Sequence, residues 1–310
     1  MSRDRDVVLS VQGLKKDFGK VHALKGIDLQ LERPGVYGFL GPNGAGKTTT
    51  FKIISGLISA SAGTVSICGS DIRTEKREAL SNLGILFDSP AFYPYLTGKE
   101  NLEVFAKWTG LDSGKEIDSL LDMVGLARAL DRKTGEYSWG MKRRLGIASC
   151  LLGDPKLMIL DEPTNGLDPA GIADIRRLLP QLAGDSDRVI MLSSHRMDEV
   201  DQICDHVTII NEGEIVASGD TEELSRPKAV VNIICGDSLK AASILGNIEG
   251  IESVDRTGRD RLSVLSPGMP AATINTLLVE AGIEVRQVME NRETLEEIFF
   301  RLTGEGKNEE

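Results

Sequence analysis

Residues 41–49 read Gly-Pro-Asn-Gly-Ala-Gly-Lys-Thr-Thr, and they constrain this chain more than any other segment. The glycines allow a tight backbone turn in which successive N–H groups point into one concavity. An apolar run at 36–40 precedes the segment, and a helical pattern at 49–54 follows it. Strand, glycine loop and helix are the context in which G-x-x-x-x-G-K-[ST] holds nucleotide phosphates against a helix N-terminus. The segment therefore predicts an α/β fold that binds a nucleoside triphosphate.

Within this loop the side chains have distinct expected roles. Lys47 supplies a positive charge for the β- and γ-phosphates, and Thr48 offers a hydroxyl to Mg²⁺. The alternative, an ordinary glycine-rich turn beside a lysine, does not explain the flanking strand and helix. The predicted nucleotide contacts are Gly41, Pro42, Asn43, Gly44, Ala45, Gly46, Lys47, Thr48 and Thr49.

The composition limits the classes of partner. The chain has 310 residues and a formal net charge of −11, which argues against bulk binding to nucleic acid or anionic lipid. No run approaches the roughly 18 apolar residues that span a bilayer. The first residues lack the apolar core of a secretory signal, so we expect a cytoplasmic protein. The four cysteines show no metal-ligand spacing and are expected to be buried, reduced thiols: Cys68, Cys150, Cys204 and Cys235.

The pattern along the chain predicts two domains. Apolar runs at 157–160 and 189–192 are typical of parallel strands buried on both faces. After about residue 228 the sequence pattern predicts elements in the order β-α-β-β-α-β, which suits a small ferredoxin-like α+β unit. We therefore expect a nucleotide-binding domain at 1–224 with a helical subdomain at about 90–153, an accessory domain at 225–304, and a disordered polar tail at 305–310.

Two acids follow the apolar run at 157–160. Asp161 can hold Mg²⁺ through water, and Glu162 can act as a general base on an attacking water. Taken alone, the pair could equally be solvated carboxylates at a strand end, but the phosphate loop makes that alternative weak.

Four further segments complete a family pattern. They are Tyr-Ser-Trp-Gly-Met at 137–141, Asn-Gly-Leu-Asp at 165–168, His195 after an apolar strand, and Phe18 in Lys-Asp-Phe-Gly. With the loop and the acidic pair, they resemble the nucleotide-binding subunit of an ATP-binding cassette (ABC) transporter over about residues 8–220. The resemblance implies Walker A at 41–49 and Walker B at 157–162. It also implies nucleotide contacts from Phe18 (stacked on adenine), Ser138, Gly140 and Asp168, and γ-phosphate contact from the catalytic switch residue His195.

The same resemblance implies partners and location. In this family two such domains form a head-to-tail dimer, with each ATP between the phosphate loop of one copy and the signature segment of the other. Hydrolysis of Mg²⁺-bound ATP then drives a separate transmembrane permease, with the subunit on the inner face of the membrane. The serine hydroxyl in the signature can cap the helix that begins near Met141, which supports that role.

Two departures from the family pattern stand out. Trp139 and Met141 replace a small residue and a glutamine, while Ser138 and Gly140 remain. Asp88 stands where the family usually has glutamine; its carboxylate can reach Mg²⁺ but adds negative charge near the γ-phosphate. It is either a metal contact that tunes coupling or a solvated loop carboxylate.

The segments at 90–102, 141–148 and 295–304 resemble subunits of bacterial exporters of peptide antibiotics such as bacitracin and lantibiotics. Phe92, Tyr93 and Tyr95 form either a groove for the permease or a loop packed on its own domain. Two other functions remain open: a soluble ABC-type ATPase that regulates a non-transport machine, and a non-hydrolysing ATP-dependent clamp. The single cassette and the acidic balance disfavour the first. Glu162 and His195 disfavour the second, which Asp88 keeps open.

Overall fold

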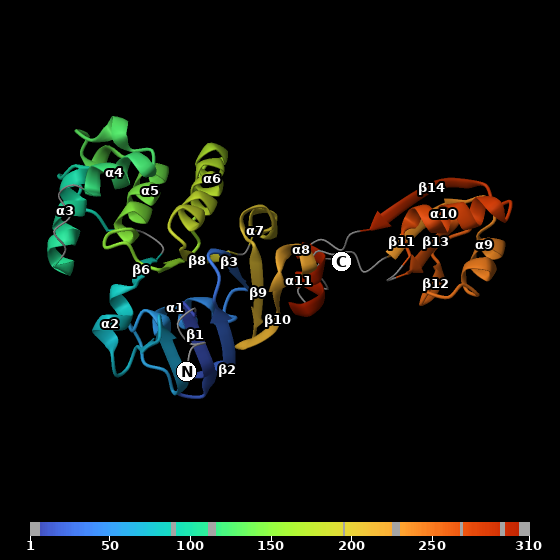
Figure 1. Cartoon of the computed structure of the whole chain (residues 1–310), viewed down its shortest axis with the longest axis horizontal. Helices are drawn as coiled ribbons and strands as arrows, with labels where there is room; N and C mark the ends of the chain where they lie inside the picture. The colour runs from blue at the N-terminus through green and yellow to red at the C-terminus, as the bar shows by residue number, and fades with distance from the viewer. Residues whose placement is uncertain are drawn as a thin grey trace. The chain divides into compact units, whose positions relative to one another are not determined.

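The computed structural model describes residues 7–87, 91–110, 116–194, 196–224, 230–266, 269–291 and 295–303. The chain divides into two compact units (Figure 1). One comprises the chain to Thr221 together with its end from Leu302 onward, and the other spans Glu222–Arg301. Asp88 and His195 both lie outside the described residues.

The first unit is built on a six-stranded sheet in the order β10-β9-β3-β8-β7-β6 (Figure 1). All its neighbouring strands are parallel except the pair β9 and β10. Parallel strands are buried on both faces, which is why the runs at β7 and β8 are continuously apolar. The strands are β3 (Gly35–Leu40), β6 (Leu83–Leu86), β7 (Leu157–Leu160), β8 (Val189–Ser194), β9 (His206–Asn211) and β10 (Glu214–Asp220).

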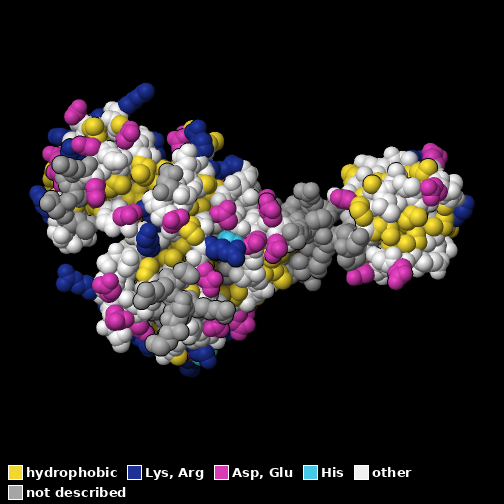
Figure 2. Space-filling model, viewed as in Figure 1, with side chains coloured by type: hydrophobic (Ala, Val, Ile, Leu, Met, Phe, Trp, Pro, Cys, Tyr) yellow, Lys and Arg dark blue, Asp and Glu magenta, His cyan; other side chains and the backbone are white. Residues whose placement is uncertain are grey.

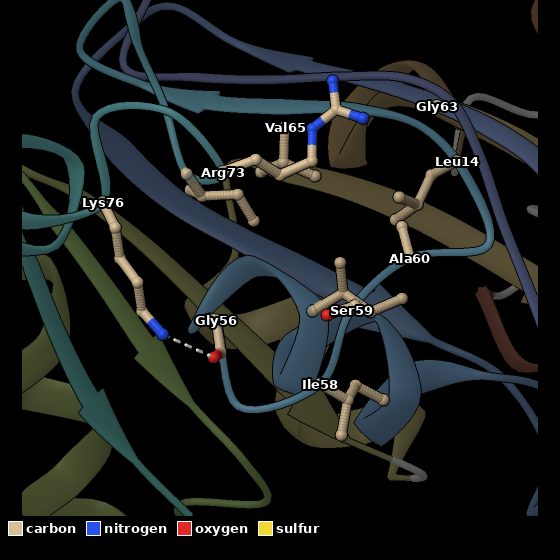
Figure 3. Close-up of a pocket in the computed structure, with 11 residues that line it drawn as sticks. Leu14, Gly56, Ile58, Ser59, Ala60, Gly63, Val65, Arg73 and Lys76 are labelled. Carbon is tan, nitrogen blue, oxygen red and sulfur yellow. Dashed lines mark hydrogen bonds between the residues drawn. The ribbon is translucent and has the colours of Figure 1, made fainter.

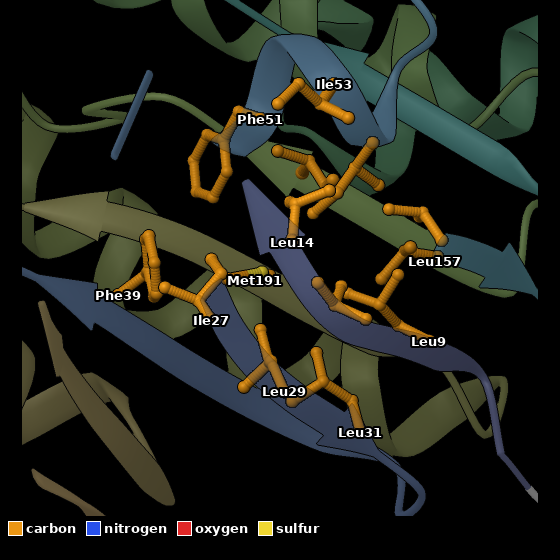
Figure 4. Packing of buried hydrophobic residues seen from close by; sticks show 14 of the residues in the cluster. Leu9, Leu14, Ile27, Leu29, Leu31, Phe39, Phe51, Ile53, Leu157 and Met191 are labelled. Carbon is orange, nitrogen blue, oxygen red and sulfur yellow. The ribbon is translucent and has the colours of Figure 1, made fainter. Parts of the chain in front are cut away.

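A second, antiparallel sheet packs on the first in the order β2-β1-β4-β5. Its inward side chains, including Leu9 and Ile27, join Phe39, Phe51 and Met191 in one buried cluster (Figure 4). This cluster ties both sheets to the helix that follows β3. The strands are β1 (Leu9–Phe18), β2 (Val21–Leu31), β4 (Ala62–Ile67) and β5 (Ser70–Asp71).

Helices cover the sheets and form the segment expected to be helical. Thr97 and Glu100 make a reciprocal capping box at the start of α3, which satisfies two otherwise unpaired backbone donors. Asp168 is the N-cap of α6, where its side chain accepts from the Gly171 N–H. The helices of this unit are α1 (Lys47–Ile54), α2 (Lys76–Ser81), α3 (Gly98–Thr109), α4 (Glu116–Met123), η1 (Ala127–Ala129), η2 (Thr134–Glu136), α5 (Trp139–Cys150), α6 (Pro169–Asp185) and α7 (Met197–Ile203).

The second unit has the β-α-β-β-α-β order that the sequence predicts. Its antiparallel sheet runs β12-β13-β11-β14, the strand order of a ferredoxin-like unit. It has its own core, in which Val231 and Val264 of the sheet meet Ile274 and Leu278. The elements from the boundary onward are α8 (Thr221–Leu224), β11 (Val230–Cys235), α9 (Ser238–Leu245), β12 (Ser253–Arg256), β13 (Arg261–Leu265), α10 (Ala271–Glu280), β14 (Val285–Asn291) and α11 (Leu295–Thr303).

Three of the four cysteines are buried free thiols, as expected, and burial raises the pKa of the Cys150 thiol to about 12. The expectation for Cys68 is wrong: it is exposed, because it lies in the turn after β4 with a left-handed φ of 48°. On the face in view in Figure 2, acidic and basic side chains are interspersed over the first unit. No helix within the described ranges is long and apolar enough to cross a membrane.

Candidate active site

The glycine-rich loop connects β3 to α1 at the carboxyl edge of the parallel sheet. Gly46 is the N-cap of α1 with φ 113°, and Gly44 has φ 83°, a region that side chains disfavour. A Cβ on Gly41 would lie 2.3 Å from the carbonyl oxygen of Ile210, so that position must also be glycine. The helix begins at Lys47 rather than at residue 49, because Gly46 already turns the chain into it.

Two side chains at the start of α1 turn toward this loop and toward β7. The Lys47 ammonium donates to the carbonyl oxygens of Gly41 (2.5 Å) and Pro42 (3.1 Å), so its charge lies over the loop. The Thr48 hydroxyl donates to Oδ2 of Asp161 at 3.3 Å. The first helical turn therefore joins the phosphate loop to the acid at the end of β7.

Asp161 is buried and holds hydroxyls on both of its oxygens. Besides Thr48, it accepts a 2.5 Å hydrogen bond from Ser193 at Oδ1. The hydroxyl and carboxylate oxygens are the hard ligands that Mg²⁺ prefers, and Mg²⁺ in such sites typically uses one or two carboxylates plus substrate phosphates. Within the described ranges no group of three or more His, Cys, Asp or Glu could hold a metal. Thr48 and Asp161 therefore fit a Mg²⁺ ion whose remaining ligands come from a bound nucleotide and water.

Glu162 has an unusual backbone. Its φ is 47°, in the left-handed region where residues other than glycine are uncommon. Its N–H donates to Oγ of Ser193 at 2.9 Å, and its carbonyl oxygen accepts from the Arg143 guanidinium. Strained conformations of this kind persist where surrounding contacts enforce them and cluster at functional sites. The backbone beneath the predicted base is therefore fixed from two sides.

Neither Ser193 nor Arg143 was predicted as a site residue. The sequence signal for Ser193 is its place directly after the apolar run at 189–192, as Asp161 directly follows the run at 157–160. The structure adds the register, because β7 and β8 pair in parallel with Leu160 opposite Leu192. That register places residue 193 beside residue 161 at the carboxyl edge. Arg143 left no comparable signal, because its contacts depend on how α5 docks against the end of β7.

The signature segment forms the start of α5. Ser138 is the N-cap, and its Oγ accepts from the Met141 N–H at 3.2 Å, which confirms the predicted hydroxyl cap. The helix begins at Trp139, two residues before the predicted start. Ser138 and Gly140 line a hollow of roughly 400 Å³ together with Asp168, whose Oδ1 caps α6 by accepting from Gly171 N–H.

The predicted residues thus fall into two groups. In the first group, the loop at 41–49 is joined through Thr48 to Asp161, which Glu162 follows. In the second group, Ser138, Gly140 and Asp168 line the separate hollow. Phe18, at the end of β1, is 51% exposed, and the Lys16 ammonium lies 4.9 Å from its ring centroid. A face of an exposed aromatic ring is a platform on which a base can stack.

A further hollow of roughly 250 Å³ lies beyond the C-terminal end of α1 (Figure 3). Leu14, Ile58 and Val65 give it an apolar lining, and the Lys76 ammonium at its rim donates to the Gly56 carbonyl oxygen at 3.0 Å. None of the predicted site residues lines this hollow.

Comparison with known proteins gives consistent results. The family model described as ABC transporter matches residues 24–165. The bacitracin transport ATP-binding protein BcrA of Bacillus licheniformis is 36% identical over 300 residues, covering 96% of this chain and 98% of that protein. The daunorubicin resistance ATP-binding protein DrrA3 of Streptomyces coeruleorubidus is 34% identical, covering 97% and 98%. The structure of cbiO1 from Clostridium perfringens, part of the ABC transporter complex cbiONQ, matches with a TM-score of 0.65 and 31% identity, covering 71% of this chain and 90% of that one.

Proposed function

The chain belongs to the ATP-binding subunits of ABC transporters, and on that premise we propose that it powers a separate membrane permease that exports a drug or an antimicrobial peptide. ATP binding and hydrolysis follow from the family. The cargo class is supported by the near full-length similarity to proteins of bacitracin transport and daunorubicin resistance.

The observation that carries the catalytic part is the convergence of Thr48 and Ser193 on Asp161, beside the loop and the strained Glu162. Mg²⁺ bound by Thr48 and Asp161 would neutralise charge on the phosphates. Lys47 would hold the β- and γ-phosphates. Glu162 would accept a proton from the water whose oxygen bonds to the γ-phosphorus as the bond to the β–γ bridging oxygen breaks and ADP leaves.

The second group of residues supports a proposal that involves a second copy of the chain. Ser138 and Gly140 lie at the N-terminus of α5, a position suited to an anion. We propose that they contact the γ-phosphate of ATP held by the other copy in a head-to-tail dimer, with Asp168 near the same nucleotide. In this proposal Phe18 stacks on adenine and His195 contacts the γ-phosphate. Asp88 reaches the metal.

An aromatic cluster on the helical segment is the proposed docking site for the permease. We define it by Phe92, Tyr93, Tyr95, Phe105 and Trp108, whose rings make successive contacts with centroids 5.6–6.2 Å apart. Phe92, Tyr93 and Phe105 are half-buried, whereas Tyr95 and Trp108 are 64% and 69% exposed. Exposed aromatic side chains that pack against half-buried aromatic rings are typical of protein interaction sites.

The accessory domain at 225–304 has no proposed part in the chemistry. The described residues proposed for nucleotide and metal lie before Thr221, in the first unit.

The catalytic proposal is tested by Glu162→Gln. The amide cannot accept the proton, so turnover should fall by about 10²–10⁴-fold while ATP binding remains. The variant should also accumulate an ATP-bound dimer, measurable by light scattering. Wild-type turnover in Glu162→Gln would exclude the base role.

The transport proposal is tested with the native complex. Purification from membranes should recover a permease, and reconstitution with that permease should stimulate ATP hydrolysis. A Tyr95→Ser, Trp108→Ser variant should keep basal hydrolysis and lose most of the stimulation. Recovery of a ribosomal or DNA-associated machine in place of a permease would favour the soluble ATPase.

A further inference from the structure

Arg143 is a buried cation beneath the catalytic loop. It lies on α5 and is only 1% exposed. Its guanidinium donates to the carbonyl oxygens of three successive residues: Asp161 at 3.3 Å, Glu162, and Pro163 at 3.0 Å. One side chain of the signature helix therefore fastens the backbone at the end of β7.

A guanidinium is a costly way to fill this space. Burial penalises a charge unless many hydrogen bonds replace its water. An apolar side chain of similar length would fill the same volume without that penalty. What arginine adds is a rigid planar fork of donors that can engage several acceptors at once. The contacts thus point to a positional task and not to packing alone.

The position it controls is that of Glu162. The φ of 47° turns the chain sharply between β7 and the following loop. Ser193 holds the N–H of Glu162 from the side of the sheet, and Arg143 holds its carbonyl oxygen from the side of α5. Without the second contact the peptide after Glu162 can rotate toward a relaxed conformation, and its carboxylate moves with it.

We propose that Arg143 is a positioning residue for ATP hydrolysis: it holds Glu162 in its catalytic orientation and ties the base to the helix that begins at Ser138. A nucleotide contact at Ser138 is thereby linked to the base of the same chain. The inference rests on the proposed role of Glu162 as the base.

The chain provides a matched control in Arg188. It is also buried, at 4% exposed, and its guanidinium also donates to backbone carbonyl oxygens, those of Pro155 at 2.9 Å and Leu182 at 3.2 Å. Pro155 precedes the opposite end of β7, away from Glu162. Removing Arg188 therefore removes a buried guanidinium without touching the catalytic loop.

The experiment compares Arg143→Met with Arg188→Met in the full-length protein, using MgATP as substrate. Methionine is flexible, unbranched and similar in length. Both variants should lower Tm. Only Arg143→Met should lower kcat, by about 10- to 100-fold, with KM within about threefold, because the lost interaction acts on the chemical step. Arg143→Lys should recover part of the kcat, since an ammonium keeps charge and donors.

A double variant separates positioning from general damage. If Arg143 acts through Glu162, adding Arg143→Met to Glu162→Gln should slow the residual turnover by less than about twofold, because residues that act as a unit are non-additive. Equal kcat values for Arg143→Met and Arg188→Met, or full additivity with Glu162→Gln, would overturn the inference. If Arg143→Met does not fold, Arg143→Lys against Arg188→Lys carries the same comparison. If Glu162→Gln lowers kcat but the Arg143 variants keep the wild-type kcat, only the inference about Arg143 is excluded. If Glu162→Gln keeps the wild-type kcat, the proposed role of Glu162 as the base is excluded as well.

Discussion

The Ser193 hydroxyl donates to Oδ1 of Asp161 at 2.5 Å, and its Oγ accepts the Glu162 N–H at 2.9 Å. One serine on β8 thus orients the proposed metal ligand and the backbone of the proposed base. This arrangement follows from the parallel register of β7 and β8, which brings the ends of both strands to the same edge of the sheet.

Ser193→Ala tests this relationship. The variant leaves one carboxylate oxygen and one backbone N–H without the serine hydroxyl. Loss of such an outer partner typically lowers metal affinity by about 10- to 100-fold. We expect the Mg²⁺ concentration for half-maximal ATPase activity to rise accordingly. The control is Ser266→Ala. Ser266 is also a buried serine, but its hydroxyl donates to the backbone carbonyl oxygen of Met269. An unchanged Mg²⁺ dependence in Ser193→Ala would show that the hydroxyl does not orient the ligand.

Phe18→Ala should weaken ATP binding by about 1–3 kcal/mol, the usual value of stacking between an aromatic side chain and a base. Binding of inorganic tripolyphosphate should not change, because it has no base to stack. Titration calorimetry with both ligands measures the difference. Lys16→Met is the control that removes the cation 4.9 Å from the ring centroid and leaves the Phe18 ring in place. An equal loss for both ligands would place Phe18 outside the adenine site.

Trp139 joins the signature segment to the loop before α6. Its indole N–H donates to the Asn165 carbonyl oxygen at 3.1 Å, and a Cβ on Gly166 would lie 3.0 Å from the same nitrogen. Trp139→Phe keeps an aromatic ring but removes the donor, and the lost hydrogen bond contributes about 0.5–1.5 kcal/mol. In the Glu162→Gln background we expect ATP affinity to stay constant and the ATP-induced dimer to weaken up to about tenfold, by light scattering. An unchanged dissociation constant of the dimer would show that the Trp139 hydrogen bond does not contribute to dimer formation.

The sequence predicted those elements whose pattern is local. The apolar runs of β7 and β8 and the helix α1 needed only composition and spacing. The hairpin of β1 and β2 was not predicted. Its register shifts between Val11 and Leu14 and again farther along, so the alternation of inward and outward side chains is broken.

The site divides in the same way. The loop at 41–49 and the acids at 161–162 lie in contiguous motifs, so spacing along the chain was sufficient to find them. Ser193 and Arg143 act through contacts 32 and 18–20 residues distant along the chain. Those contacts depend on strand register and helix docking, which residue spacing alone does not determine.

Lys47→Ala should abolish tight ATP binding. Lys47 is the only cationic residue in the loop at 41–49, and its ammonium already lies over the loop on the carbonyl oxygens of Gly41 and Pro42. A hydrogen bond to a charged group contributes about 1.5–3 kcal/mol, so the Kd should rise about 10- to 100-fold. Lys52→Ala is the matched control, because Lys52 lies on the same helix, exposed in its last turn. Fluorescence titration with an ATP analogue measures both variants. If Lys47→Ala binds as tightly as Lys52→Ala, the phosphates are held elsewhere and the loop has been assigned wrongly.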